Sequence, residues 1–338
     1  MKISKFSQST ADPCLFILHQ KDEMVIVALY VDDLVITGSD NLIKWTKDKL
    51  AEKFEMKDLG DIKYLLGIQV SRNASGIYLS QSTFITRVLE KFNMSDCKPN
   101  VTPALMPTKD ESELFTDPNL YMQAVGSLNY LATRTRPDLT YAVGQVARNM
   151  HQPTHNDWIA VKRIFRYLQG TINTKLKFSI QNSELIGYSD ASYAPNADDR
   201  KSTSGYVFVK NGGAISWRSK KQPIVSLSSM ESEYIALASA TKEGIWLKQL
   251  ELDIFPKMEK SITIYEDNQS AIKTASNEIH NERSKHIDVR YHFIRECVNN
   301  GRIILKYCPT EKMVADAFTK PLCRVKLNQH VVGMGLIH

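Results

Sequence analysis

The sequence of 338 residues is 43% hydrophobic and 24% charged, which is the composition of an ordinary globular protein and excludes long disordered regions. Its 43 Lys and Arg against 37 Asp and Glu give a net charge of +6, a mildly basic balance that only weakly favours a nucleic-acid partner. The five cysteines form no CxxC pair and indicate neither a zinc site nor a disulfide framework, and no apolar run of about 20 residues suggests a membrane span.

The length and the N-terminus set two further expectations. A chain of this length predicts two or three domains, each able to bury its own core. The N-terminal segment MKISKFSQSTADPC is polar and unlike a signal peptide. We therefore expect an intracellular protein that is neither secreted nor bound to a membrane.

The first part of the chain alternates β-rich runs with turn residues. Apolar runs at 14–20, 24–30 and 34–39 predict three strands. The second and third flank the segment YVDD, which places Asp32 and Asp33 at a hairpin tip. Adjacent acids there are compatible with a solvated turn or with a divalent-metal site, and the residues alone favour the turn.

A helical block connects this part to the second half. Amphipathic spacing predicts helices over 41–54 and 82–92, and the proline-rich segment 98–118 predicts an extended linker. Three further helices are predicted by their start and stop residues, over 120–135, 137–150 and 154–170.

From Thr171 onward the pattern predicts a mixed sheet flanked by helices. Strands are expected at 175–179, 185–192, 204–212, 213–219, 261–267 and 302–308. Helices are expected at 228–252, 267–275, 282–298 and 311–320. The predicted fold class is therefore α/β (α+β).

Four acids in this half stand where a metal site would need them. Asp190 and Asp267 each end a predicted strand, Glu233 lies early in the long helix, and Asp316 lies in the last predicted helix. Each has a structural alternative as a turn former, a helix cap or an exposed helix charge. Four carboxylates together suit a site for two Mg²⁺ ions, since Mg²⁺ prefers oxygen ligands.

The segments around these residues resemble copia-type (Ty1/copia) retrotransposon Pol polyproteins. YVDD with its flanks is similar to the reverse transcriptase hairpin, and KYLLGIQVSRN followed by GIYLSQ is similar to that enzyme's primer-contacting hairpin. The resemblance implies a partial reverse transcriptase over 1–97, a linker and helical thumb or connection over 98–170, and a ribonuclease H-like domain over 171–338. Asp32 and Asp33 would be the remnant of an RNA-directed DNA polymerase site.

The likeness is most specific in the ribonuclease H-like part. YSDASYA, SLSSMESEYIAL, EDNQSAI, RSKHIDVRYHFIRE and VADAFTKPL occur in the family's order. The resemblance implies that the metal-binding catalytic acids are Asp190, Glu233, Asp267 and Asp316. The neighbouring Glu231 is the alternative to Glu233. Two Mg²⁺ ions, with Mn²⁺ as a substitute, would be the cofactors.

The expected reaction is hydrolysis of the RNA strand of an RNA–DNA hybrid. Basic residues expected to hold the hybrid's phosphates are Arg218, Lys220, Lys221, Arg283 and Lys285. The further palm Asp and the fingers of a polymerase would lie before Met1, so we expect no polymerisation by this chain alone. A companion Pol fragment or a dimer partner would be the source of these parts, and the resemblance implies a cytoplasmic particle or the nucleus as the location. A non-catalytic nucleic-acid binder or an inert transposon remnant is the alternative function.

Overall fold

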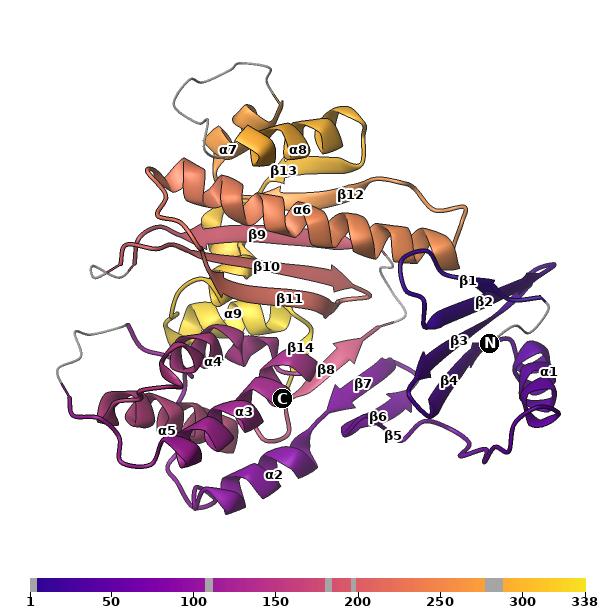
Figure 1. Ribbon diagram of the computed structural model, residues 1–338, viewed down its shortest axis with the longest axis horizontal. Helices are drawn as coiled ribbons and strands as arrows, with labels where there is room; N and C mark the ends of the chain where they lie inside the picture. Colours follow the sequence, from indigo (N-terminus) through magenta and orange to yellow (C-terminus); the bar gives the residue numbers. More distant parts are fainter. Residues whose placement is uncertain (1–4, 107–111, 180–183, 196–198, 277–287) are drawn as a thin grey trace. The chain divides into compact units, whose positions relative to one another are not determined.

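The computed structural model describes residues 5–106, 112–179, 184–195, 199–276 and 288–338 (Figure 1). The chain forms two compact units. The first unit comprises Met1–Ile62 and Lys242–Ser261, and the second comprises Lys63–Thr241 and Ile262–His338. No helix in the described part is both long and apolar enough to cross a bilayer.

The first unit contains a four-stranded antiparallel sheet. Its strands, in sheet order, are β1 (Ser7–Gln8), β2 (Leu15–Gln20), β3 (Glu23–Tyr30) and β4 (Asp33–Gly38). The predicted hairpin lies between β3 and β4, where Tyr30 pairs with Asp33. Val31 at its tip has φ 54°, which is a strained conformation for a β-branched residue.

Helix α1 (Asp40–Ala51) and the C-terminal part of α6 (Ser229–Ile254) complete the first unit. Leu42 of α1 packs with Leu18 and Val25 of the sheet. From α6, Asp253 accepts hydrogen bonds from the backbone N–H groups of Thr10 and Ala11 and from the Ser9 hydroxyl. A carboxylate that satisfies several orphan donors fixes this loop against the helix.

An antiparallel sheet of five short strands runs through the second unit. Its order is β14 (Leu336–Ile337), β8 (Lys175–Phe178), β7 (Gly76–Ser80), β6 (Ile68–Asn73) and β5 (Tyr64–Leu65). The segment that resembles the primer-contacting hairpin, β6 and β7, therefore pairs through β8 with the C-terminal strand β14.

Helices pack beside this sheet (Figure 1). They are α2 (Ser82–Lys91), α3 (Pro118–Arg134), α4 (Thr140–Val146) and α5 (His155–Gln169), with the 3-10 turns η1 (Pro137–Leu139) and η2 (Ala147–Asn149) on either side of α4. Helix α5 begins as predicted, because Thr154 and Asp157 form a reciprocal capping box.

The second sheet of this unit is mixed, as the sequence predicts. Its order is β11 (Gly213–Lys221), β10 (Thr203–Lys210), β9 (Ile186–Ser192), β12 (Ile262–Glu266) and β13 (Ile303–Tyr307). Strands β9, β10 and β11 are antiparallel, whereas β12 runs parallel to both β9 and β13. The turn between β10 and β11 has Asn211 and Gly212 at positive φ, as tight hairpins require.

Helices and turns after β11 carry the rest of the chain. They are α6, α7 (Gln269–Ser276), α8 (Asp288–Asn299), the 3-10 turns η4 (Thr310–Lys312) and η5 (Val314–Phe318), and α9 (Arg324–Gly333). The α-helix predicted over 311–320 is wrong. Met313, with ψ 94°, interrupts the helical backbone and leaves two short turns, and Asp316 lies in the second.

One hydrophobic core joins the two sheets of the second unit. It contains Leu128 of α3, Phe165 of α5, Leu176 of β8, Val207 of β10 and Phe318 of η5. Segments expected to belong to separate domains therefore stabilise one another. Together the sheets and helices confirm the predicted α/β class, with a mixed sheet flanked by helices.

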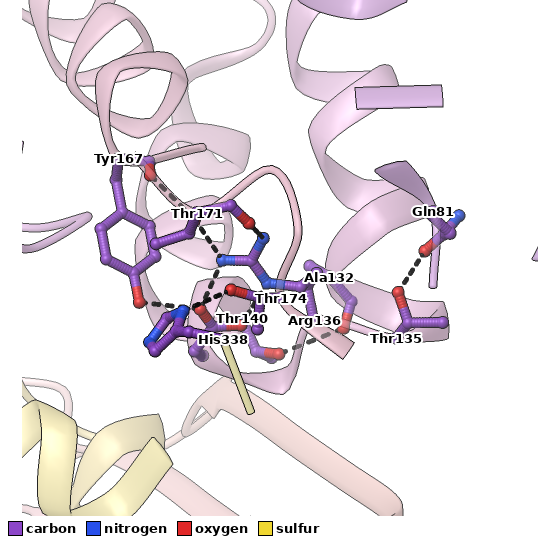
Figure 2. A network of polar contacts seen from close by, with 10 residues as sticks. Gln81, Ala132, Thr135, Arg136, Thr140, Tyr167, Thr171, Thr174 and His338 are labelled. Carbon is purple, nitrogen blue, oxygen red and sulfur yellow. Dashed lines mark hydrogen bonds and ion pairs between the residues drawn. The ribbon is translucent and has the colours of Figure 1, made fainter. Parts of the chain in front are cut away.

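A fully buried ion pair lies where α3 meets α5. Arg136 donates from Nε and Nη2 to the two carboxylate oxygens of Asp138 at 2.9 and 2.7 Å. Its guanidinium also donates to the carbonyl and hydroxyl oxygens of Thr171, while the Tyr167 hydroxyl donates to Asp138 (Figure 2). Burial alone would lower the pKa of Arg136, but the Asp138 carboxylate outweighs burial and raises it.

Gly205 controls how closely η5 approaches the mixed sheet. A Cβ at this position would lie 2.7 Å from Cβ of Phe318 and 2.7 Å from Cγ2 of Thr319. Gly205 pairs with Asp190 on the neighbouring strand. The missing side chain therefore lets η5, which carries Asp316, pack over β10 beside Asp190.

Replacing Arg136 by Met should lower the free energy of unfolding by about 3–5 kcal/mol, because Asp138 would remain buried without its counter-ion. Urea unfolding would measure the change. Lys47→Met is the control, since it removes an exposed ion pair of 2.9 Å to Asp58 and should leave the free energy of unfolding close to that of the parent. Equal losses in the two variants would contradict the account.

Replacing Gly205 by Ala should cost about 1–3 kcal/mol, because the added methyl group has no space beside Phe318. Gly126→Ala is the matched control, since Gly126 lies in α3 with no atom within 4 Å of an added Cβ. That variant should keep or gain stability, as Ala is the better helix former. Equal unfolding midpoints for Gly205→Ala and Gly126→Ala would rule out a packing role for Gly205.

Candidate metal centre

The register of the two central strands brings two of the predicted acids together. Strands β9 and β12 are parallel, and Tyr188 pairs with Tyr265 with their rings stacked 5.2 Å apart. Asp190 and Asp267 each follow two residues after these tyrosines. Asp190 lies near the end of β9 and Asp267 directly follows the end of β12, so both acids lie at the edge of the sheet where the two parallel strands end.

Two other segments supply the remaining acids. The turn η5 presents Asp316, and oxygens of Asp190, Asp267 and Asp316 lie within 4.8 Å of one another. The start of α6 presents Glu233, which lies within the same distance of Asp267 and of Glu266. The structure thus brings all four predicted acids to one place.

Glu266 was not predicted as a member of this site. It is the last residue of β12, is completely buried, and accepts a hydrogen bond from the backbone N–H of Asn268 at 3.2 Å. In the sequence, the only feature that points to Glu266 as a member of this site is its position directly before Asp267. Strand alternation would place such a neighbour on the opposite face of the sheet, but the chain turns away from the sheet immediately after Glu266.

Glu231 has a different position from Glu233. Its Oε2 accepts a hydrogen bond from the backbone N–H of Leu227 at 2.8 Å, and its own N–H donates to the hydroxyl of Ser228. These contacts hold the first turn of α6, as an N-terminal capping motif does. Among the described residues, Glu233 rather than Glu231 joins the group of acids.

Burial shapes the electrostatics of the cluster. It raises the pKa of Asp190 to about 7, against the opposing effect of the Lys320 ammonium. Burial and then the Glu266 carboxylate raise the pKa of Glu233 well above its usual range. Burial also raises the pKa of Glu266. The cluster therefore disfavours full ionisation unless a cation compensates it.

The donor set fits a divalent cation. Oε2 of Glu233, Oε2 of Glu266 and Oδ2 of Asp316 are buried without a hydrogen-bond partner. Buried anionic oxygens that lack donors are unfavourable, and binding to a metal ion would satisfy them. All of these ligand atoms are carboxylate oxygens, which Mg²⁺ and Mn²⁺ prefer.

Asp32 and Asp33 form no comparable arrangement. Both are exposed at the β3–β4 hairpin, beside Tyr30 and Val31, which are 53% and 79% exposed. Within the described ranges, neither belongs to a group of three metal-type side chains. The hairpin that draws attention in the sequence is therefore the less complete of the two candidate sites.

The predicted basic residues are distributed along an edge strand. Arg218 and Lys220 are exposed on β11, which lies two strands away from β9. Lys221 forms an ion pair with Asp199, and burial, followed by the charge of Arg148, lowers its pKa. Arg283 and Lys285 lie outside the described residues.

Metal-free protein should lose stability as the pH rises from about 4 to about 7. The folded state holds protons on Asp190 and Glu233 at a pH where the unfolded chain has released them. Each such proton contributes a slope of about 1.4 kcal/mol per pH unit, with stability falling as pH rises. Urea unfolding with EDTA, compared between the parent and Asp190→Asn, would measure this effect.

The free energies of unfolding of the parent and of Asp190→Asn should converge at low pH, and Asp190→Asn should be the more stable protein near pH 8. Mg²⁺ should narrow that difference by stabilising the parent. A parent that gains stability relative to the variant as pH rises without metal would contradict the raised pKa of Asp190.

Comparison with known proteins agrees with the sequence resemblance. A family model described as reverse transcriptase (RNA-dependent DNA polymerase) matches residues 1–106. The retrovirus-related Pol polyprotein from transposon TNT 1-94 of Nicotiana tabacum is 41% identical over 99% of this chain. The chain spans about a quarter of that relative's length, since the match covers 26% of it.

A shorter relative is covered almost completely. An uncharacterized mitochondrial protein of Arabidopsis thaliana is 42% identical over 64% of this chain and 92% of its own length. Among solved structures, the foamy viral protease-reverse transcriptase in complex with an RNA/DNA hybrid matches 84% of this chain and 36% of its own, with 14% identity and a TM-score of 0.49. On the sequence relatives, the chain belongs to the family of copia-type retrotransposon Pol polyproteins.

Proposed function

We propose that the second unit hydrolyses the RNA strand of RNA–DNA hybrids in a reaction that depends on Mg²⁺. The observation that carries this proposal is the buried group of carboxylates, which converge from β9, β12, α6 and η5. Their unpartnered oxygens favour a cation, and the family membership favours a nucleic-acid substrate. The predicted division into 1–97, 98–170 and 171–338 belongs to the same proposal as a division by function rather than by packing, since the core of the second unit extends across residue 170.

In this proposal Asp190, Glu233, Asp267 and Asp316 would hold two Mg²⁺ ions. When bound, the ions would supply the positive charge that hydrolysis of a phosphodiester by water needs. The protein's contribution is to fix the carboxylates before the substrate arrives. The Thr319 hydroxyl donates to Asp190, and the Thr310 hydroxyl donates to Asp267 at 2.7 Å.

The edge strand β11 offers a surface for the hybrid's backbone. Arg218 and Lys220 are exposed two residues apart on this strand, and both present positive charge to phosphates. An RNA–DNA hybrid as substrate also implies an intracellular location.

Mn²⁺ would substitute for Mg²⁺ because both metal ions accept carboxylate oxygens as ligands. We assign no polymerase activity to the YVDD hairpin, whose two acids are exposed and without a third among the described residues.

The purified chain should cleave a labelled RNA–DNA hybrid with Mg²⁺ present, and Asp190→Asn should reduce the rate by about a hundredfold or more. Loss of one metal ligand removes several kcal/mol of transition-state stabilisation. Gel analysis of RNA fragments would measure the rates. No cleavage by the parent, or equal cleavage by the variant, would leave the non-catalytic binder or the inert remnant as the function.

Two glutamates of one helix provide a matched comparison in this assay. Glu233→Gln should lower the cleavage rate like Asp190→Asn. Glu231 is also buried, but it contacts the start of α6. Glu231→Gln should therefore lower the free energy of unfolding and leave the cleavage rate of the folded fraction close to that of the parent. Primer extension by the parent would contradict the view that the YVDD hairpin is inactive in this chain.

A further inference from the structure

Lys320 lies among the buried acids of the metal centre. Its Nζ is 2.8 Å from Oδ1 of Asp316 and 4.0 Å from Oδ2 of Asp190. The side chains of these acids are only 1% and 2% exposed, whereas that of Lys320 is 37% exposed. The ammonium group therefore enters the cluster from the solvent side and contacts two acids that are otherwise closed off.

Local backbone structure holds Lys320 in this position. Its N–H donates to the carbonyl oxygen of Asp316, one helical turn earlier, at 3.3 Å. The preceding residue, Thr319, donates its hydroxyl to Asp190. Consecutive side chains after η5 thus donate to the acids of β9 and η5, and Thr319, the first of the two, packs closely on Gly205.

The ammonium group and a metal ion would compete for the same two carboxylates. Asp190 and Asp316, the two partners of Lys320, are also two of the three acids whose oxygens gather within 4.8 Å. One positive charge cannot balance several buried carboxylates, but a divalent cation at this point would repel a nearby ammonium strongly. Simultaneous close contact of both cations with Asp316 is therefore unfavourable.

We propose that Lys320 is an internal counter-ion, which holds Asp190 and Asp316 in place before metal binds and is displaced from them by the metal ion. This inference rests on the proposed function, since it concerns the same metal centre. The partly exposed position of the flexible Lys320 side chain gives its ammonium group a path into solvent. Metal binding is then an exchange of cations, and Lys320 weakens it by the strength of its own ion pairs.

Mn²⁺ binding to the full, metal-free chain without hybrid tests this exchange. Calorimetry should show that Lys320→Gln binds Mn²⁺ about tenfold more tightly than the parent, because the competing cation is gone. Without metal, the same variant should melt at a lower temperature. Lys320→Arg keeps the charge and should bind more weakly than Lys320→Gln. Lys326→Gln, an exposed site on α9 with the same charge change, should match the parent.

A second measurement needs no variant. Acylation of Lys320 by a water-soluble amine reagent, followed by peptide mass spectrometry, should become several-fold faster when Mn²⁺ is added. Unchanged or weaker Mn²⁺ binding by Lys320→Gln, or acylation that Mn²⁺ leaves unchanged or slows, would overturn the proposal. If Mn²⁺ displaces Lys320 as expected but the chain does not cleave the hybrid, the proposed function is wrong and the exchange of cations stands.

Discussion

The mutual repulsion of buried carboxylates is the constraint on which the second unit depends. Asp190, Glu233, Glu266 and Asp316 are each at most 7% exposed and belong to overlapping groups of acids. Such an arrangement opposes folding unless protons or cations compensate the charge. Hydroxyl donors and the Lys320 ammonium compensate part of this charge. The raised pKa values of Asp190, Glu233 and Glu266 favour bound protons, which reduce it further.

The scaffold around the cluster is arranged to keep these groups in place. Asp190 lies on the central strand of the mixed sheet, with an antiparallel neighbour on one side and a parallel neighbour on the other. Gly205 on the antiparallel neighbour admits η5, and the parallel neighbour leads into Asp267. The shared core and the Arg136–Asp138 pair stabilise the helices that pack behind this sheet.

Local sequence signals predicted most of the elements, although not the short strands β1, β5 and β14 or helix α9. The ends of two apolar strands pointed to Asp190 and Asp267, whereas Glu233 and Asp316 joined them through predicted helices and the family resemblance. The capping residues of α5 marked its start. The helix expected around Asp316 failed because the backbone changes direction at Met313, which residue spacing does not reveal. Glu266 and Lys320 were missed because their roles depend on long-range packing, which places an ordinary strand-end acid and a lysine beside buried carboxylates.

A crystal structure of the chain with Mn²⁺, solved with anomalous diffraction, tests the central claim most directly. We expect anomalous density between Asp190, Asp267 and Asp316, with the Lys320 ammonium withdrawn from Asp316. Ordered carboxylates without anomalous density in crystals grown with excess Mn²⁺, or Mn²⁺ density with Lys320 still paired to Asp316, would contradict this expectation.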